Sequence, residues 1–255
     1  MNGSKSPKSR GRLAAAAGRI GWWGNERPKT QQVPGVHAVI HDWIHSENLL
    51  SLLAAAMGLK VLVACEYSGR VRSAFRELGH DAWSCDILPA EDKSEHHIQL
   101  DVTEVLNDGW DMMIAFPPCQ FLAKAGARWL YPSGSIDYER MRQLEEGRDF
   151  FLQLWQAPIP RIAIENPTPL KAAELPHWSQ IIQPWEFGDP YTKRTLLWLK
   201  RLPHLIPTET VEPMKSWTLS KRQVKDRSRT FQGIADAMAN QWSQPFTLEM
   251  FMKEV

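Results

Sequence analysis

The stretch Met112-Met113-Ile114-Ala115-Phe116-Pro117-Pro118-Cys119-Gln120 decides the fold of this chain. Its apolar first half predicts a short buried strand, and the two prolines end that strand abruptly. Cys119 therefore comes at the carboxyl end of a strand, which is the edge of an open α/β sheet where ligands bind. A lone cysteine after a proline-rich turn is also typical of a buried structural thiol, so the rest of the chain has to decide between the two interpretations.

Strand-like and helix-like segments alternate on both sides of this stretch. The sequence predicts strands at 60–65, 82–85, 97–100, 111–115, 161–164 and 195–199, and helices over about 69–79 and 137–156, with a loop that opens into a helix over 229–239. The alternation predicts an α/β fold with a mostly parallel sheet and helices on both faces. The apolar spacing predicts that the first two helices bury Val71, Phe75, Leu78, Met141, Leu144, Phe151 and Trp155.

Polar residues follow several of these strands in a specific order. The first strand leads into Glu66-Tyr67-Ser68-Gly69, the next two end at Asp86 and Asp101, and a later strand ends in Glu165-Asn166-Pro167. Together with Cys119, this order resembles that of the cytosine-C5 DNA methyltransferases, which use S-adenosylmethionine as the methyl donor.

The resemblance extends over roughly 58–243 and implies a Rossmann-like, S-adenosylmethionine-dependent methyltransferase fold. Asp86 would accept the two ribose hydroxyls, and Asp101 would contact the adenine amino group. For each aspartate alone, a helix cap or a turn is the alternative role. The family usually has three glycines in the first turn, where this chain keeps only Gly69. The expected cofactor-binding residues are Glu66, Tyr67, Ser68, Gly69, Asp86, Ile87, Asp101 and Pro117.

The resemblance also implies the chemistry. Cytosine C5 is a poor nucleophile, and a thiolate that adds to C6 converts the ring into an enamine whose C5 can attack a methyl sulfonium. Cys119 is the expected nucleophile, and Glu165 is the expected proton donor to cytosine N3. Asn166 would fix the loop and the orientation of Glu165.

The paired arginines of the family fall on Lys193 and Thr195 of this chain, with Arg194 between them. Lys193 or Arg194 would hold the cytosine O2 atom or a phosphate, and Arg194 is the fourth expected catalytic residue. A solvated basic turn is the alternative. The loop after Cys119 is expected to be a lid whose cations and aromatic rings suit a flipped base. The expected nucleic-acid contacts are Gln120, Lys124, Arg128 and Lys193.

The region between the arginine motif and the last helix is short. Only 34 residues separate Thr195 from Thr230, including a basic stretch over 215–229, whereas family members usually carry a long target-recognition region here. DNA with a flipped cytosine is the expected substrate, and a partner protein could supply specificity. Two alternatives stay open. The substrate is a cytosine of a free nucleotide or of RNA, or the chain is a catalytically inactive relative that binds cofactor or nucleic acid.

The composition limits the partners and the compartment. The 255 residues carry a formal net charge of +1, so no overall basic field marks a polyanion-binding protein. The three cysteines lack CxxC spacing, which predicts a reduced, cytoplasmic protein of a bacterium or phage-infected cell. No apolar run is long enough to span a membrane. No metal is expected, because no carboxylate or cysteine completes a site with His37, His41 and His45.

The composition also divides the chain into three parts. Residues 1–56 are rich in Lys, Arg, Ser, Gly and Ala and are expected to be a basic extension, disordered or partly helical, that the catalytic fold does not need. Residues 57–243 form the expected catalytic domain, and 244–255 form a C-terminal tail. We expect the protein to act as a monomer.

Overall fold

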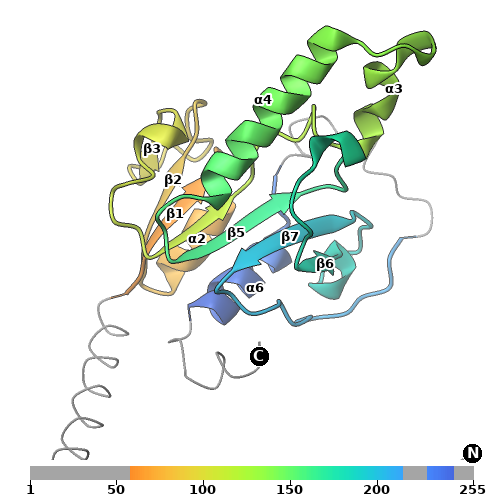
Figure 1. Ribbon diagram of the computed structural model, residues 1–255. Coiled ribbons are helices and arrows are strands. Elements are labelled where there is room, and N and C mark those ends of the chain that lie inside the picture. Colours follow the sequence, from red (N-terminus) through yellow and green to blue (C-terminus); the bar gives the residue numbers. More distant parts are fainter. Residues whose placement is uncertain (1–57, 215–228, 244–255) are drawn as a thin grey trace, which may run out of the picture. The chain divides into compact units, whose positions relative to one another are not determined.

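The computed structural model describes residues 58–214 and 229–243. Within these ranges the chain forms a seven-stranded sheet with the strand order β3-β2-β1-β4-β5-β7-β6 (Figure 1). The strands are β1 (Lys60–Ala64), β2 (Asp81–Cys85), β3 (His97–Ile98), β4 (Met112–Ala115), β5 (Arg161–Asn166), β6 (Gln180–Ile182) and β7 (Thr195–Lys200). The α-helices are α2 (Arg70–Glu77), α3 (Ala127–Leu130), α4 (Tyr138–Trp155) and α6 (Gln232–Trp242).

Parallel pairing brings the ends of the central strands to one edge. Strands β3, β2, β1, β4 and β5 run parallel, whereas β7 is antiparallel to both β5 and β6. Ala115 of β4 pairs with Ala64 of β1 on one side and with Ile164 of β5 on the other. The segments that follow β1 and β4 therefore start level with one another at the carboxyl edge of the sheet, and β5 extends two residues further along that edge.

Helices cover both faces of the sheet, because alternate strand residues point to opposite faces. Val63 of β1 belongs to one core with Phe75 of α2 and Met238 of α6. Its neighbour Leu62 belongs to a second core with Phe151 of α4. Figure 1 shows α4 on one side of the sheet and α2 and α6 on the other. This is a Rossmann-like α/β fold with a mostly parallel sheet and helices on both faces, which confirms the predicted fold class.

The predicted buried faces of the helices need three corrections. Leu78 is 45% exposed, because α2 ends at Glu77 and the next residue leaves the helical face. Met141 and Trp155 are only partly buried and pack at the margin of the core under α4. The other predicted residues are buried: Val71, Phe75, Leu144 and Phe151.

Three segments at the carboxyl edge also differ from the prediction. Glu165 and Asn166 belong to β5 rather than following it, because the antiparallel strand β7 pairs with both of them. The predicted strand 97–100 is only two residues long, at His97–Ile98. The loop after Cys119 is not irregular, since it contains α3 and a 3-10 turn on each side of it.

Some predictions lie outside the described residues. These are the basic extension, the three histidines within it, the C-terminal tail, and the basic stretch apart from Arg229. Among the described residues, no helix is long and apolar enough to cross a membrane.

Two glycines in helices have opposite surroundings. Gly233 lies in the first turn of α6, where an added Cβ atom would stand 1.7 Å from the backbone oxygen of Phe187. Gly147 lies within α4, where the nearest atom to an added Cβ would be Cγ of Leu122 at 3.4 Å, an ordinary contact. Only the absence of a side chain at Gly233 lets α6 approach the chain this closely.

We expect Gly233→Ala to lower the free energy of unfolding by about 1–3 kcal/mol, because the backbone has to move apart to admit the methyl group. Gly147→Ala is the matched control and should raise the free energy of unfolding by about 0.5–1 kcal/mol, because alanine loses less backbone entropy in a helix than glycine. Urea denaturation of both variants beside the wild type measures the difference. Two variants of equal stability would contradict the close approach at Gly233.

Candidate active site

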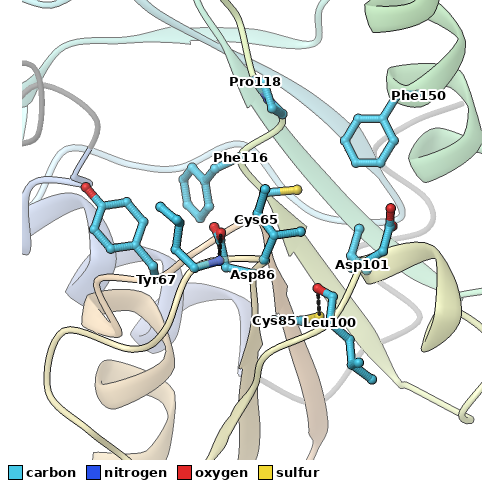
Figure 2. A pocket seen from close by; sticks show the side chains of 12 residues that line it. Cys65, Tyr67, Cys85, Asp86, Leu100, Asp101, Phe116, Pro118 and Phe150 are labelled. Carbon is cyan, nitrogen blue, oxygen red and sulfur yellow. Dashed lines mark hydrogen bonds between the residues drawn. The ribbon is translucent and has the colours of Figure 1, made fainter.

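A cavity of about 440 Å³ lies at the carboxyl edge of β1, β2 and β4 (Figure 2). Most of its wall is apolar, with two carboxylates, two thiols and one phenol set into it. In Figure 2, Tyr67 lies on one side of the cavity, and Asp101 and Phe150 lie together on the other. The lining residues are Cys65, Tyr67, Cys85, Asp86, Ile87, Leu88, Leu100, Asp101, Val102, Phe116, Pro118 and Phe150.

Asp86 and Asp101 line this cavity and also form local turns. Oδ1 of Asp86 accepts a hydrogen bond from the backbone N–H of Leu88 at 2.9 Å. Oδ1 of Asp101 accepts from the backbone N–H of Thr103 at 2.9 Å and from its hydroxyl at 2.8 Å. Burial raises the pKa of Asp86. A role in a turn and a role in ligand binding are therefore compatible for both aspartates, since the local hydrogen bonds fix each carboxylate at the cavity wall.

Glu66 is buried and supports helix α2 rather than the cavity. Its Oε1 accepts hydrogen bonds from the backbone N–H of Val71 and from the hydroxyl of Ser68, both at 3.0 Å. The carboxylate thus caps a helix whose N-cap residue, Gly69, has no side chain to do so. Of the four residues in the turn 66–69, which was expected to bind the cofactor, only Tyr67 lines the cavity. Pro117, which was also expected to bind the cofactor, is buried but does not line the cavity.

Eight lining residues were missed by the sequence reasoning. Phe116 and Pro118 are neighbours of the predicted Pro117, so the motif itself contained a signal for them. Phe150 reaches the cavity from α4, and no local pattern indicates this. The remaining five are Cys65, Cys85, Leu88, Leu100 and Val102.

Two further thiols, those of Cys65 and Cys85, lie in the cavity wall. Burial raises the pKa of both thiols, that of Cys85 to about 11. Cys65 directly follows β1 and has a φ of 57°, a left-handed conformation that is strained for a residue with a side chain. Such strained residues cluster at ligand sites, which agrees with the position of Cys65 in the wall.

A second, much smaller cavity shares Phe116 with the first. There Nζ of Lys193 lies 3.6 Å from Oε1 of Glu165, and the two side chains are only 25% and 15% exposed. Oε1 of Glu165 is buried and has no hydrogen-bond partner in the part of the chain that the structure describes. A buried acceptor without a partner is available to a ligand. The other lining residues are Thr195, Thr230, Phe231, Ile234 and Met238.

The thiol of Cys119 is coupled to these two charges. Burial raises the pKa of Cys119, the carboxylate of Glu165 raises it further, and the ammonium of Lys193 lowers it. The structure therefore brings a thiol, a carboxyl group and a cation together at the ends of β4 and β5 and the start of β7. The expected catalytic cation, Arg194, is exposed instead. Lys193 lies against Glu165 in its place, because consecutive residues of an extended chain point to opposite sides.

Main-chain hydrogen bonds join the loops that follow β4 and β5. The N–H of Lys124 donates to the carbonyl of Thr168 at 2.8 Å, and the N–H of Leu170 donates to the carbonyl of Leu122 at 2.7 Å. These bonds hold the loop that follows β4, which contains Cys119, at a fixed distance from the loop that follows β5.

Asn166 does not fix these loops through hydrogen bonds of its side chain. It is fully buried, and neither its amide nitrogen nor its amide oxygen has a hydrogen-bond partner among the described residues. Its side chain also lies on the opposite face of β5 from that of Glu165. The main-chain bonds between the loops take the role that was predicted for Asn166.

The predicted nucleic-acid contacts separate into two groups. Gln120, Lys124 and Arg128 are exposed on the segment after Cys119, whereas Lys193 lies beside Glu165. Within the described ranges, no group of three or more His, Cys, Asp and Glu side chains is arranged to hold a metal ion.

Comparison with known proteins gives similar structures but no family. No protein-family model matches the chain, and no curated protein matches its sequence. One similar solved structure is described as a DNA modification methyltransferase encoded within an E. coli prophage, with 17% identity and a TM-score of 0.37 over 61% of this chain and 52% of that one. Another is an rRNA methylase from Escherichia coli, with 13% identity and a TM-score of 0.32 over 64% and 65%. The chain thus covers less than two thirds of either structure, and its fold assignment depends on the strand order above.

Charge changes at Glu165 and Lys193 should shift the reactivity of Cys119 in opposite directions. Glu165→Gln removes the negative charge that raises the thiol pKa, so alkylation by iodoacetamide at pH 8 should be about two- to tenfold faster. Lys193→Met removes the cation that lowers the pKa, so alkylation should be slower by a similar factor. Mass spectrometry of the Cys119 peptide over time measures both rates.

Two controls accompany this experiment. Arg194→Met removes an exposed neighbouring cation and should leave the rate at Cys119 unchanged. Cys85 in the same digest should stay unmodified in every variant, because it is fully buried, so its alkylation would report loss of the fold. Rates that move in the same direction in Glu165→Gln and Lys193→Met would disprove the coupling.

Proposed function

We propose that this protein is a DNA cytosine-C5 methyltransferase that uses S-adenosylmethionine. The observation that carries the proposal is the cluster of Cys119, Glu165 and Lys193 next to a cavity lined by Asp86 and Asp101. A nucleophilic thiol and a proton donor are the groups needed to activate a pyrimidine ring at C5.

The larger cavity has the chemistry to bind the cofactor. The carboxylates of Asp86 and Asp101 offer acceptors for hydroxyl and amino groups, and apolar residues such as Ile87, Leu100 and Phe150 suit the adenine ring. Its volume of about 440 Å³ is that of a small-molecule site. When bound, S-adenosylmethionine supplies an electrophilic methyl group.

The smaller cluster would activate the base. The thiolate of Cys119 adds to cytosine C6, the C5–C6 electron pair forms a C4–C5 double bond, and the C4–N3 pair moves to N3, which takes a proton from Glu165. Once C5 carries the methyl group, a water molecule takes the C5 proton, the thiolate of Cys119 leaves C6, and N3 returns its proton to Glu165, which restores the aromatic ring and the free enzyme. Lys193 favours the thiolate form and offers a donor to the base oxygen O2.

Two observations favour this proposal over a free-nucleotide substrate and over an inactive relative. The exposed residues Gln120, Lys124 and Arg128 follow the nucleophile directly, where they would meet phosphates beyond the target nucleotide. This supports a polynucleotide over a free nucleotide. The coupling of Cys119 to Glu165 and Lys193 supports an active enzyme over an inactive relative. We also infer, from the sequence alone, a cytoplasmic monomer.

The first experiment is methyl transfer from labelled S-adenosylmethionine to unmodified DNA. We expect the wild type to form 5-methylcytosine and Cys119→Ser to form none, because the hydroxyl is too weak a nucleophile to add to C6. Cofactor affinity should change by less than about threefold in this variant, because the thiol acts only on the base.

Three results would contradict the proposal. Product in Cys119→Ser would remove Cys119 as the nucleophile, and loss of cofactor binding in that variant would place Cys119 in the wrong cavity. If the wild type binds the cofactor but methylates no DNA, the substrate becomes an RNA or a free nucleotide, or the chain is an inactive relative.

Asp86→Ala should weaken the binding of S-adenosylmethionine by about 1–3 kcal/mol, because ribose hydroxyls would lose their acceptor. Isothermal titration calorimetry measures the affinity. Asp86→Asn keeps an oxygen that can accept the hydrogen bond from the Leu88 N–H. This variant therefore shows whether the affinity depends on the turn or on the negative charge of the carboxylate. Asp108→Ala, an exposed change before β4, is the matched control. Unchanged affinity in Asp86→Ala would remove this residue from the site.

A further inference from the structure

The segment that follows Cys119 exposes three aromatic rings. Trp129 is 59% exposed, Tyr131 is 46% exposed and Tyr138 is 83% exposed. All three come from ten consecutive residues that contain the end of α3 and the first residue of α4. Large aromatic side chains in water on one short segment indicate a binding surface, because their burial against a partner is favourable.

The charge of this segment selects the partner. From Gln120 to Ile136 the sequence contains Lys124 and Arg128 and no acidic residue. Tyr138 lies between Asp137 and Glu139, and the carboxylate of Asp137 is engaged in the cap of α4. Both cations are exposed, and the guanidinium of Arg128 lies over the ring of Trp129 at 4.8 Å from its centroid. Aromatic rings interleaved with cations fit a polyanion that also offers flat rings, which is the chemistry of a nucleic acid.

The backbone under these rings is held in place. Leu130 is fully buried, and its carbonyl accepts a hydrogen bond from the N–H of Asp137 at 3.0 Å. The carboxylate of Asp137 in turn caps α4 through the N–H of Arg140 at 3.0 Å. Figure 1 shows α3 beside the amino-terminal end of α4. The segment therefore presents its aromatic side chains to solvent from a fixed platform that lies 10 to 19 residues after the nucleophile.

We propose that this platform, formed by Trp129, Tyr131 and Tyr138 with Lys124 and Arg128, binds single-stranded DNA. The faces of unpaired bases are free to stack on aromatic rings, whereas a duplex keeps its base faces within its own stack. The cations contact the phosphates between the stacked bases. This inference rests on the proposed function and specifies the strand state of its substrate. A target cytosine in a single strand also needs no extrusion from a duplex.

The test is fluorescence anisotropy with the full chain and a labelled 16-nucleotide DNA, single-stranded or annealed to its complement. We expect the wild type to bind the single strand at least about tenfold more tightly than the duplex. The triple variant Trp129→Ala, Tyr131→Ala, Tyr138→Ala should lose about twentyfold or more in affinity for the single strand and less than about twofold for the duplex. The pair Ile206→Ala, Met214→Ala removes exposed apolar side chains elsewhere and should change neither affinity.

A second measurement separates this inference from the proposed function. The three rings are exposed, so the triple variant should keep the thermal stability and the cofactor affinity of the wild type. Preference for the duplex, binding to neither DNA, or unchanged single-strand affinity in the triple variant would overturn the inference. If instead the single strand binds as expected but is not methylated, the platform stands and the proposed methyl transfer fails.

Discussion

The parallel pairing of β4 with β5 is the constraint on which the candidate active site depends. Its register ends with Ala115 opposite Ile164, so the next residues along the two strands, Phe116 and Glu165, start side by side. Cys119 and Glu165 are 46 residues apart in sequence, and this ladder brings their loops together. The same placement makes Phe116 part of both cavities, so the two sites meet at one rigid, proline-flanked segment. Two reactants held in this way need little further ordering to react.

A buried polar network supports the other part of the same edge. Arg72 of α2 is only 1% exposed, donates to Oγ of Ser84 at 2.8 Å and pairs with Asp92. Ser84 also contacts Nδ1 of His97 at 2.8 Å, and Nε2 of His97 contacts the carbonyl of Leu88 at 2.9 Å. A buried charge persists only when it is paired. The network therefore ties α2, β2 and β3 to the segment that forms one wall of the larger cavity.

Local patterns in the sequence were sufficient for six of the seven strands, for α2, α4 and α6, and for several site positions, whereas β6 and α3 were not predicted. Short apolar runs ended by prolines or acids are properties of neighbouring residues, so the strand ends that lead to Cys119 and Asp86 could be predicted. Asp101, by contrast, lies three residues beyond the end of β3. The three helices were predicted because apolar spacing is also local. The sequence alone located the carboxyl edge of the sheet, and the larger cavity lies there.

Only the tertiary structure decided which side chains meet. The antiparallel direction of β7 lengthens β5 to Asn166, and the partner strand lies about 30 residues further along the chain. Three other features also depend on contacts between elements that are distant in sequence or on the direction of a side chain. They are the cap formed by Glu66, the contact of Lys193 rather than Arg194 with Glu165, and the position of Phe150 in the cavity wall. Each depends on the direction in which a side chain points and on what another element places there, and a local sequence pattern encodes neither.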